Sequence, residues 1–436
     1  MDPILNIAAN ALATADAEMA VEAQNTANAN TVGYESESVT VDPLAYQNTL
    51  EGSVATQVVQ STDPIDAHAL LDATSTSQYW ATQATGSQSL QSAFAEPQTG
   101  GIQETLNALQ NAWTAYQSAP TSSSDATEIV SQAQNTAQVF NSLNNMLTDN
   151  LAGVTADIKQ QAALVPSLLA QIATLNNTIN ASQPGTSQAA NAIDQLNQTL
   201  QQLASVAAIQ VIPEANGSVI VNSQNATLVT GTQIPLAPGW QVGDNPPAGL
   251  ISVVPAPAAP PASAPTLMLN GSIPWSPSSG SLGGLLATAL TVSGWQVGLT
   301  SVAAQLTAIP AWSGPPPVTL FTIAAGQLSV SPQVLASVTQ LQSTQAGAAQ
   351  TAINGAVSSW SALVGQVGAA GQLATEQSTT SQENVTAITQ NFESQTSVDT
   401  NQAAQNLIQD QQAYSAAAQI MNIAQQTVNA LLAAVQ

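Results

Sequence analysis

The chain has 436 residues, of which one is Lys or Arg and 25 are Asp or Glu, so its formal net charge is −24 at pH 7. A nucleic-acid-binding function is excluded, because neutralising phosphates requires many cations and the chain carries only Lys159. The sequence contains no cysteine, which excludes disulfides, thiolate metal sites and thiol nucleophiles. The length is typical of roughly two to four domains.

The charge is distributed unevenly along the chain. Residues 245–375 contain no Asp, Glu, Lys, Arg or His. Below about pH 3 most carboxylates are protonated, which would leave the molecule nearly neutral. We hypothesise that the protein works in an acidic external medium, where a normal Lys and Arg content would leave a large positive charge. Compositional drift within one lineage is the alternative explanation.

The N-terminal residues have neither a basic region nor a continuous apolar run, so we do not expect a secretory signal peptide. No stretch of about 18 apolar residues is apparent, so we do not expect a membrane-spanning helix or membrane insertion. If the protein leaves the cell, it is expected to use a route that needs no cleaved signal.

The first predicted element is a helix that ends near Asn28. Leu5, Leu12 and Met19 recur every seventh residue with Ala8 and Ala15 between them, which predicts a narrow apolar seam of the kind that two helices share. The following residues are rich in Asn, Thr and Gly, which favour turns, and residues 38–43 alternate like a short strand. Residues from about 44 to 100 have weak periodicity and are expected to be mostly loop.

Helical periodicity returns at Gly101 and continues over three predicted helices. The first has one apolar face, made of Ile102, Leu106, Leu109, Trp113 and Tyr116. Asp125 and Glu128 have a spacing like that of a capping box and are expected to start the second helix. Pro166 is expected to kink or briefly interrupt this long helix. After a turn, the returning helix carries Ile193, Leu196, Leu200 and Leu203.

The period changes at Ile209. Residues 209–221 are typical of two short strands around Asn216-Gly217, a strong hairpin signal, and Pro213 confines the first strand to an edge. The Pro-rich residues 253–265 are expected to form a stiff extended connection. Further strands are expected around residues 267–269, 318–323 and 328–330, and helical patterning resumes near Pro332.

The last helix has the clearest pattern. Apolar residues recur at strict sevens over four heptads, with Ala417, Ala424 and Leu431 each three residues after one of them. Such a seam needs a partner, and the simplest expectation is that the two terminal helices pack on each other. The residues at sevens are Leu407, Tyr414, Met421, Val428 and Val435.

Together these elements predict a mainly α fold with a β insertion: terminal coiled-coil helices, a helical bundle or rod, and a small β domain. Residues 1–100 would form the N-terminal coiled-coil helix and an extended connector, and residues 101–205 a helical bundle domain. Residues 206–330 would form a β-rich outer domain with the Pro-rich connection. Residues 331–436 would form C-terminal helices that pack with the N-terminal arm.

The residues after the first helix resemble a motif shared by the rod, hook and junction proteins of bacterial flagella. Val32 stands where this motif usually has Pro. The matching residues are Asn25, Ala27, Asn28, Asn30, Thr31, Gly33 and Tyr34.

Later segments are similar, in order, to the flagellar hook-associated protein 1 family, the hook–filament junction proteins. In the last segment Asp410 and Gln419 depart from the family pattern. The similar segments are residues 134–149, 192–231, 279–286, 328–336 and 401–435. Residues shared with the family near the end are Asn406, Leu407, Gln411, Gln412, Ala413, Tyr414, Ala416 and Ala418.

This resemblance implies a structural protein, without catalytic activity or cofactor, that joins hook to filament by subunit self-assembly outside the cell. It implies export without a cleaved signal peptide through the flagellar type III apparatus, with a dedicated chaperone. The implied partners are a ring of identical subunits, the hook protein and the second junction protein. The expected assembly seam, which could also pack within the chain, is Leu5, Leu12, Met19, Leu407, Tyr414, Met421, Val428, Leu431 and Val435.

Two other readings stay open from the sequence. A hook or rod protein would share the motif but not the segments at residues 281–286 and 328–336, and a secreted acid-stable binding protein is a less favoured alternative. A metal or catalytic role for His68 has weak support, because the neighbouring acids do not by themselves make a converging ligand set. The Gly283-Gly284 pair is not followed by the lysine of a phosphate-binding loop.

Overall fold

The computed structural model describes the chain apart from residues 1–2, 32, 47–48, 63, 95–99, 224–225, 231–250, 253–265, 270–272, 276–278, 315, 325 and 436. The predicted Pro-rich connection at 253–265 therefore lies outside the described residues. The fold is mainly α with small antiparallel sheets, as predicted. It divides into two compact units, the first from residues 1–76, 164–240 and 382–436, and the second from residues 77–163 and 241–381.

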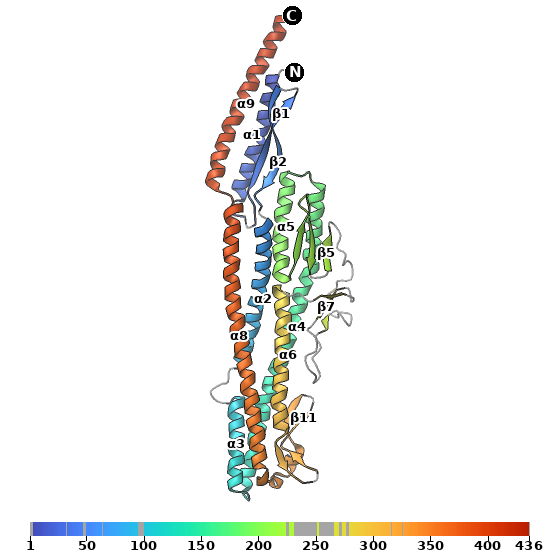
Figure 1. Cartoon of the computed structure of the whole chain (residues 1–436), viewed down its shortest axis with the longest axis vertical. Helices are drawn as coiled ribbons and strands as arrows, with labels where there is room; N and C mark the ends of the chain where they lie inside the picture. Colours follow the sequence, from blue (N-terminus) through green and yellow to red (C-terminus); the bar gives the residue numbers. More distant parts are fainter. Residues whose placement is uncertain are drawn as a thin grey trace. The chain divides into compact units, whose positions relative to one another are not determined.

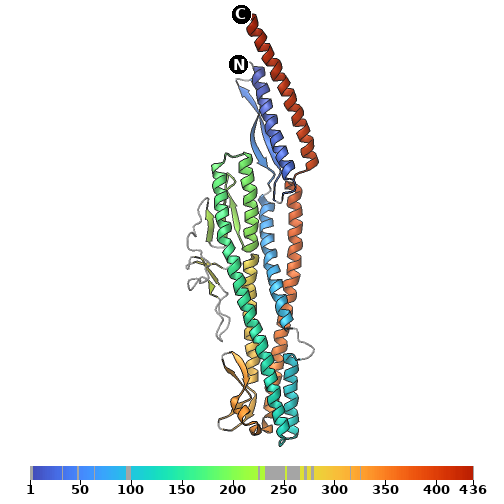
Figure 2. The same cartoon turned by 180° about the vertical axis from the view of Figure 1, so that it is seen from behind.

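The first unit contains both terminal helices, and α1 and α9 lie side by side in both views (Figures 1 and 2). The hairpin of β1 and β2 also contacts α1. Its elements are α1 (Pro3–Asn28), β1 (Glu37–Tyr46), β2 (Thr49–Gln60), the start of α2 (Pro64–Phe94), the end of α4 (Ser123–Ala181), α5 (Ser187–Val206), β3 (Gln210–Pro213), β4 (Val219–Ser223), β5 (Ala226–Thr230), the end of α8 (Ala346–Thr396) and α9 (Thr400–Val435).

The second unit is built on the remaining parts of α2, α4 and α8. It also contains α3 (Ile102–Ser118), β6 (Ile251–Ser252), β7 (Thr266–Leu269), β8 (Ile273–Trp275), α6 (Gly280–Thr307), β9 (Pro310–Trp312), β10 (Val318–Thr319), β11 (Phe321–Ala324), β12 (Gln327–Val330), α7 (Pro332–Ala336) and two 3₁₀ turns, η1 (Val338–Gln340) and η2 (Ser343–Gln345).

The expectation of mostly loop between about residues 44 and 100 is wrong. This stretch holds the long strand β2 and the 31-residue helix α2. Helix α2 buries small polar side chains as well as leucines, including Ser75, Ser77 and Ser87. A stripe of serine and alanine has little hydropathy contrast with the exposed face, so the apolar pattern of an amphipathic helix does not appear in the sequence.

Helix α4 begins at Ser123, before the predicted start. The hydroxyl of Ser122 accepts a hydrogen bond from the backbone N–H of Asp125 at 3.2 Å, so Ser122 caps the helix and Asp125 lies inside it. Of the kink or short break predicted at Pro166, the break does not occur, because the helix continues to Ala181. Buried neighbours such as Val165 and Leu169 keep this part helical, since packing overrides the lost hydrogen bond.

The four predicted domain ranges remain a prediction, but the range 206–330 contains one element that was not predicted. Helix α6 is 28 residues long and apolar on all sides, so it shows no helical period. It is long and apolar enough to cross a membrane, contrary to the expectation from the sequence. More than half of its most apolar window is buried within the protein, as in the core helix of a water-soluble domain.

The predicted hairpin around Asn216-Gly217 forms in a three-stranded sheet. Strands β3 and β4 are antiparallel, with Pro213 opposite Val219, and β3 lies at the edge as Pro213 requires. Gly217 has φ +90°, a backbone conformation that favours glycine.

Three asparagines on helices each pair with both backbone groups of one residue in a strand. Asn25 donates to the Glu37 carbonyl at 2.8 Å and accepts from its N–H at 2.9 Å. Asn176 makes the same pair with Val219, at 2.8 and 3.0 Å, and Asn141 with Leu328, at 2.9 and 2.8 Å. A side-chain amide has the donor and acceptor of a peptide group, so each asparagine replaces a missing neighbouring strand. We call these three contacts the amide clamps.

The close approach of α6 to α2 in the second unit predicts a strong effect of one methyl group. A Cβ on Gly284 would lie 2.6 Å from the Tyr79 carbonyl oxygen and 2.8 Å from the Thr82 Cβ. Gly284→Ala should therefore lower the free energy of unfolding by about 2 kcal/mol through overpacking. Gly294→Ala on the same helix should instead raise it by about 0.5 kcal/mol, because nothing lies within 4 Å of that Cβ. Urea denaturation followed by tryptophan fluorescence measures both, and equal effects would contradict the packing.

Candidate functional site

The contact between α1 and α9 is centred on alanines. Ala8 and Ala15 of α1 and Ala417 and Ala424 of α9 are all buried. The predicted seam residues are covered less completely: Tyr414 is 37% exposed, and the side chains of Leu431 and Val435 lie outside the described residues. The others are half-buried, namely Leu5, Leu12, Met19, Leu407, Met421 and Val428.

A second apolar face lies on the same pair of helices. On α9, Ile408, Ile420 and Ile423 are 55%, 47% and 63% exposed. At 100° per residue they lie within an arc of about 120°, with Ile408 and Ile423 away from the buried face that carries Ala417 and Ala424, and Ile420 at its border. We call these three residues the isoleucine face of α9. Ile4 of α1 is also exposed, so apolar side chains remain uncovered on both terminal helices of the single chain.

Acidic side chains interrupt the alanine contact. Asn406 of α9 donates to the Glu22 carboxylate of α1 at 2.7 Å. Burial, and then the charge of Glu22, raises the pKa of Asp410. Burial and the charge of Asp410 likewise raise the pKa of Glu18. Ionisation of Glu18 and Asp410 is therefore less favourable in this contact than it is in water.

The motif residues end α1 and turn the chain toward β1. Asn25 is 4% exposed and, besides its clamp on Glu37, accepts a hydrogen bond from the Tyr34 hydroxyl at 3.0 Å. The carbonyl of Asn28 accepts from the Thr31 N–H at 2.8 Å, which forms the turn. Gly33 has φ +78°, and a Cβ there would lie 2.9 Å from Gln198 of α5.

The other motif residues face solvent. Ala27 and Asn30 are exposed. The motif therefore combines residues that stabilise the turn with residues whose side chains are exposed to solvent.

A buried acidic cluster follows the motif directly. Glu35 is 2% exposed, and its carboxylate accepts hydrogen bonds from the hydroxyl of Thr62 and, at 3.2 Å, from the amide of Asn197. Burial raises the pKa of Glu35, and these two hydrogen bonds oppose the rise. Residue 35 thus ties the motif to α5 and to the end of the β1–β2 hairpin.

Asp194 and Glu37 complete this cluster. Asp194 of α5 is 5% exposed and accepts a hydrogen bond from Gln60 Nε2 at 2.6 Å. Burial, and then the charge of Glu35, raises the pKa of Asp194 to about 7, although the bond from Gln60 lowers it. Glu37 is 3% exposed, and burial raises its pKa to about 7. We call Glu35, Glu37 and Asp194 the acidic cluster.

The sequence analysis did not find the acidic cluster. Glu35 and Glu37 alternate with Ser36 and share a strand face with Val39 and Val41, a signal that could have placed both glutamates inward. No sequence signal connects them to Asp194, because the contact joins residues that are far apart in the chain.

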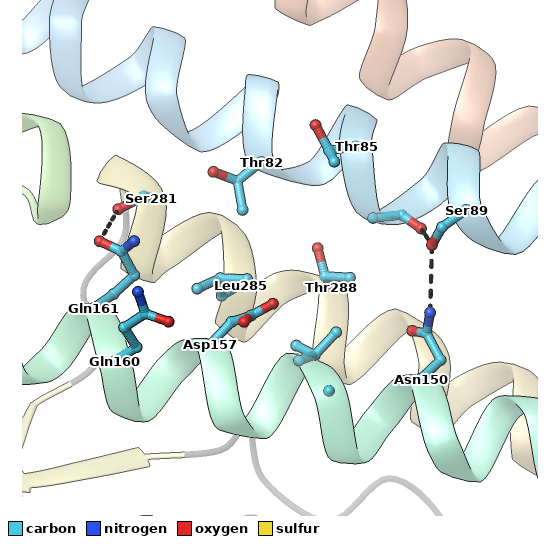
Figure 3. A pocket seen from close by; sticks show the side chains of 13 residues that line it. Thr82, Thr85, Ser89, Asn150, Asp157, Gln160, Gln161, Ser281, Leu285 and Thr288 are labelled. Carbon is cyan, nitrogen blue, oxygen red and sulfur yellow. Dashed lines mark hydrogen bonds between the residues drawn. The ribbon is translucent and has the colours of Figure 1, made fainter.

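The second unit has a cavity of about 520 Å³ between α2, α4 and α6 (Figure 3). Ser281 donates to Gln161 at 3.2 Å, and Asn150 donates to Ser89 at 3.3 Å. The threonine hydroxyls that line it donate to carbonyls of their own helices, as Thr288 does to Gly284. With Asp157 as its one acidic lining residue, the cavity has no arrangement of nucleophile, base and acid.

The described residues contain no group of three His, Cys, Asp or Glu side chains placed to hold a metal ion. His68 lies half-buried on α2. The paired terminal helices and the motif turn are held by packing and by hydrogen bonds within the chain.

Comparison with known proteins agrees with this character. The family described as "Flagellar hook-associated protein FlgK helical domain" matches residues 87–308, just over half of the chain. This chain belongs to the FlgK family of flagellar hook-associated proteins. The matched range ends one residue after α6, so α6 is a helix of the FlgK helical domain. Membership favours the hook-associated proteins over the hook and rod proteins considered above.

Solved structures that are similar include the flagellar hook junction protein FlgK from Burkholderia pseudomallei, with a TM-score of 0.46 and 20% sequence identity. The match covers 59% of this chain and 46% of that one, so the present chain spans less than half the length of that FlgK. A search of curated proteins finds no match.

Proposed function

We propose that this protein forms the junction between flagellar hook and filament by assembling with identical subunits through its terminal helices. The isoleucine face of α9 carries this proposal. Ile408, Ile420 and Ile423 stay exposed although α9 already has α1 as a partner. Burying them against a neighbouring subunit would contribute about 25 cal/mol for each Å² of apolar surface removed from water.

The further partners follow from the family and are part of the same proposal. They are the hook protein, the second junction protein, the export chaperone and the type III export apparatus, with the mature protein outside the cell. The protein would act without catalysis or cofactor. The alanine contact between α1 and α9 supports this structural role, because apolar packing without directional bonds tolerates the small shifts that a junction between bent and straight segments requires.

The experiment that tests the assembly surface is the double substitution Ile420→Asp and Ile423→Asp. Both side chains are exposed in the single chain, so the free energy of unfolding of the monomer should change by less than about 1 kcal/mol. Two carboxylates buried at a subunit contact without partners should prevent assembly. We expect cells with normal hooks, secreted monomer in the medium and no filaments, counted by electron microscopy.

The matched control places the same charges elsewhere on α9. Gln411→Asp and Gln425→Asp lie outside the isoleucine face on exposed positions, and filaments should remain. Normal filaments on the isoleucine variant would contradict the proposed surface. A gene deletion that leaves both hooks and filaments intact would contradict the junction function itself, and would exclude it in favour of a secreted binding protein.

A further inference from the structure

Three carboxyl groups are buried together where the residues after α1 meet α5. Glu35, Glu37 and Asp194 are 2%, 3% and 5% exposed. The charges of both glutamates act on Asp194, which places the three groups in one electrostatic site. Both oxygens of Glu37 and the Oδ2 atom of Asp194 are buried and accept no hydrogen bond. Negative charge on these three oxygen atoms is strongly unfavourable, because they lose water without gaining hydrogen-bond donors.

Among the described residues, the side chains that face the acidic cluster supply no positive charge. They include one further acid, Glu22, and one phenol, Tyr34, and neither can become a cation. The one Lys or Arg of the sequence is Lys159, which belongs to the other unit. The surrounding side chains are Glu22 and Asn25 from α1, Tyr34 from the motif, Gln60 from β2, Thr62 after it and Asn197 from α5.

We propose that Glu37 and Asp194 form a proton-binding site that closes the motif and β1 onto α5 in acidic medium and loosens this contact at neutral pH. A protonated carboxyl no longer repels its neighbours and becomes a hydrogen-bond donor to the carboxylate or carbonyl oxygens around it. The proposal concerns the stability of the first unit and does not depend on the proposed junction function.

The direction of the pH dependence follows from the same groups. The folded-state pKa values of Glu37 and Asp194, both about 7, lie above the values near 4 of unfolded carboxyls. The folded unit therefore binds more protons than the unfolded chain between about pH 4 and pH 7. Its stabilisation is complete below about pH 4 and is lost as the pH rises through 7.

Hydrogen exchange of the full chain, followed by mass spectrometry at about pH 4.5 and pH 7.5 and corrected for intrinsic rates, tests the proposal. Peptides that cover residues 34–60 should be protected at least about tenfold more at the lower pH. Peptides from α3 in the second unit provide the internal reference. The double variant Glu37→Gln and Asp194→Asn mimics the protonated pair, so its protection at pH 7.5 should approach that at pH 4.5.

The matched control is Asp42→Asn, which removes a carboxylate from an exposed position on the same strand. This variant should keep the tenfold difference. An equal loss of the difference in the control would assign the effect to general charge repulsion and overturn the proposal. Carboxyl ¹³C titration of the unaltered protein decides independently of any variant: midpoints for Glu37 and Asp194 near 4 would also overturn it.

Discussion

Asn25→Ala should lower the free energy of unfolding of the first unit by about 4 kcal/mol. The substitution removes both hydrogen bonds between Asn25 and the backbone of Glu37. The N–H and the carbonyl of Glu37 are then buried without partners, and each such group costs about 1–3 kcal/mol. The Tyr34 hydroxyl loses its acceptor as well. Hydrogen exchange of the Glu37 amide measures the effect, because local opening exposes that amide directly.

Asn30→Ala is the matched control for this prediction. Asn30 belongs to the same flagellar motif but is exposed, so its replacement should change stability by less than about 0.5 kcal/mol. If Asn25→Ala were as mild as Asn30→Ala, the clamp would not hold the turn. If Asn30→Ala kept the fold but reduced assembly, the exposed part of the motif would be a subunit contact.

Trp113→Ala should destabilise the second unit by about 4 kcal/mol. Trp113 is fully buried on α3 and packs edge-on against Tyr116, with 6.4 Å between ring centroids. Truncation to alanine removes the apolar contacts of the ring and leaves a large cavity. Thermal or urea unfolding followed by the fluorescence of the remaining buried tryptophans, such as Trp295 and Trp360, measures the loss.

Trp113→Phe separates the ring volume from the indole N–H. The Trp113 Nε1 atom is buried and has no hydrogen-bond partner. Phenylalanine removes this unpaired donor while keeping most of the aromatic surface, so the cost should fall below about 2 kcal/mol. Equal destabilisation by phenylalanine and alanine would show that the indole nitrogen has a partner, contrary to the structure.

The elements that sequence reasoning predicted correctly have one-sided apolar patterns or explicit turn chemistry. All five predicted face residues of α3 are buried, among them Ile102, Trp113 and Tyr116. The Asn216-Gly217 hairpin forms because its residues demand that turn. Periodicity is readable in such segments because burial selects one face and solvent the other.

The elements that sequence reasoning missed have no such contrast. Helix α2 buries serines such as Ser75 and Ser87, and α6 is apolar on every side. Helix α9 itself was predicted, and the alanines of its pattern, Ala417 and Ala424, are buried, whereas Tyr414 is 37% exposed. Leucine ranks above alanine in hydropathy, whereas close helix packing favours the smaller side chain.

The candidate site was predictable only in part. The motif pointed to Asn25 and Gly33, which the structure places at the turn. The acidic cluster depends on α5 meeting the residues after α1, and that meeting is a property of the tertiary fold. In a short stretch of sequence, Glu35, Glu37 and Asp194 each look like ordinary surface acids.

The amide clamps have a consequence for the tolerance of this protein toward its solvent. Asn25, Asn141 and Asn176 join helix to strand through groups that carry no net charge. Dissolved ions screen contacts between exposed charges but have little effect on a buried hydrogen bond between neutral groups. The joins between helices and strands should therefore survive in fresh water and in brine alike, and concentrated electrolyte should leave the β1 and β4 attachments unchanged.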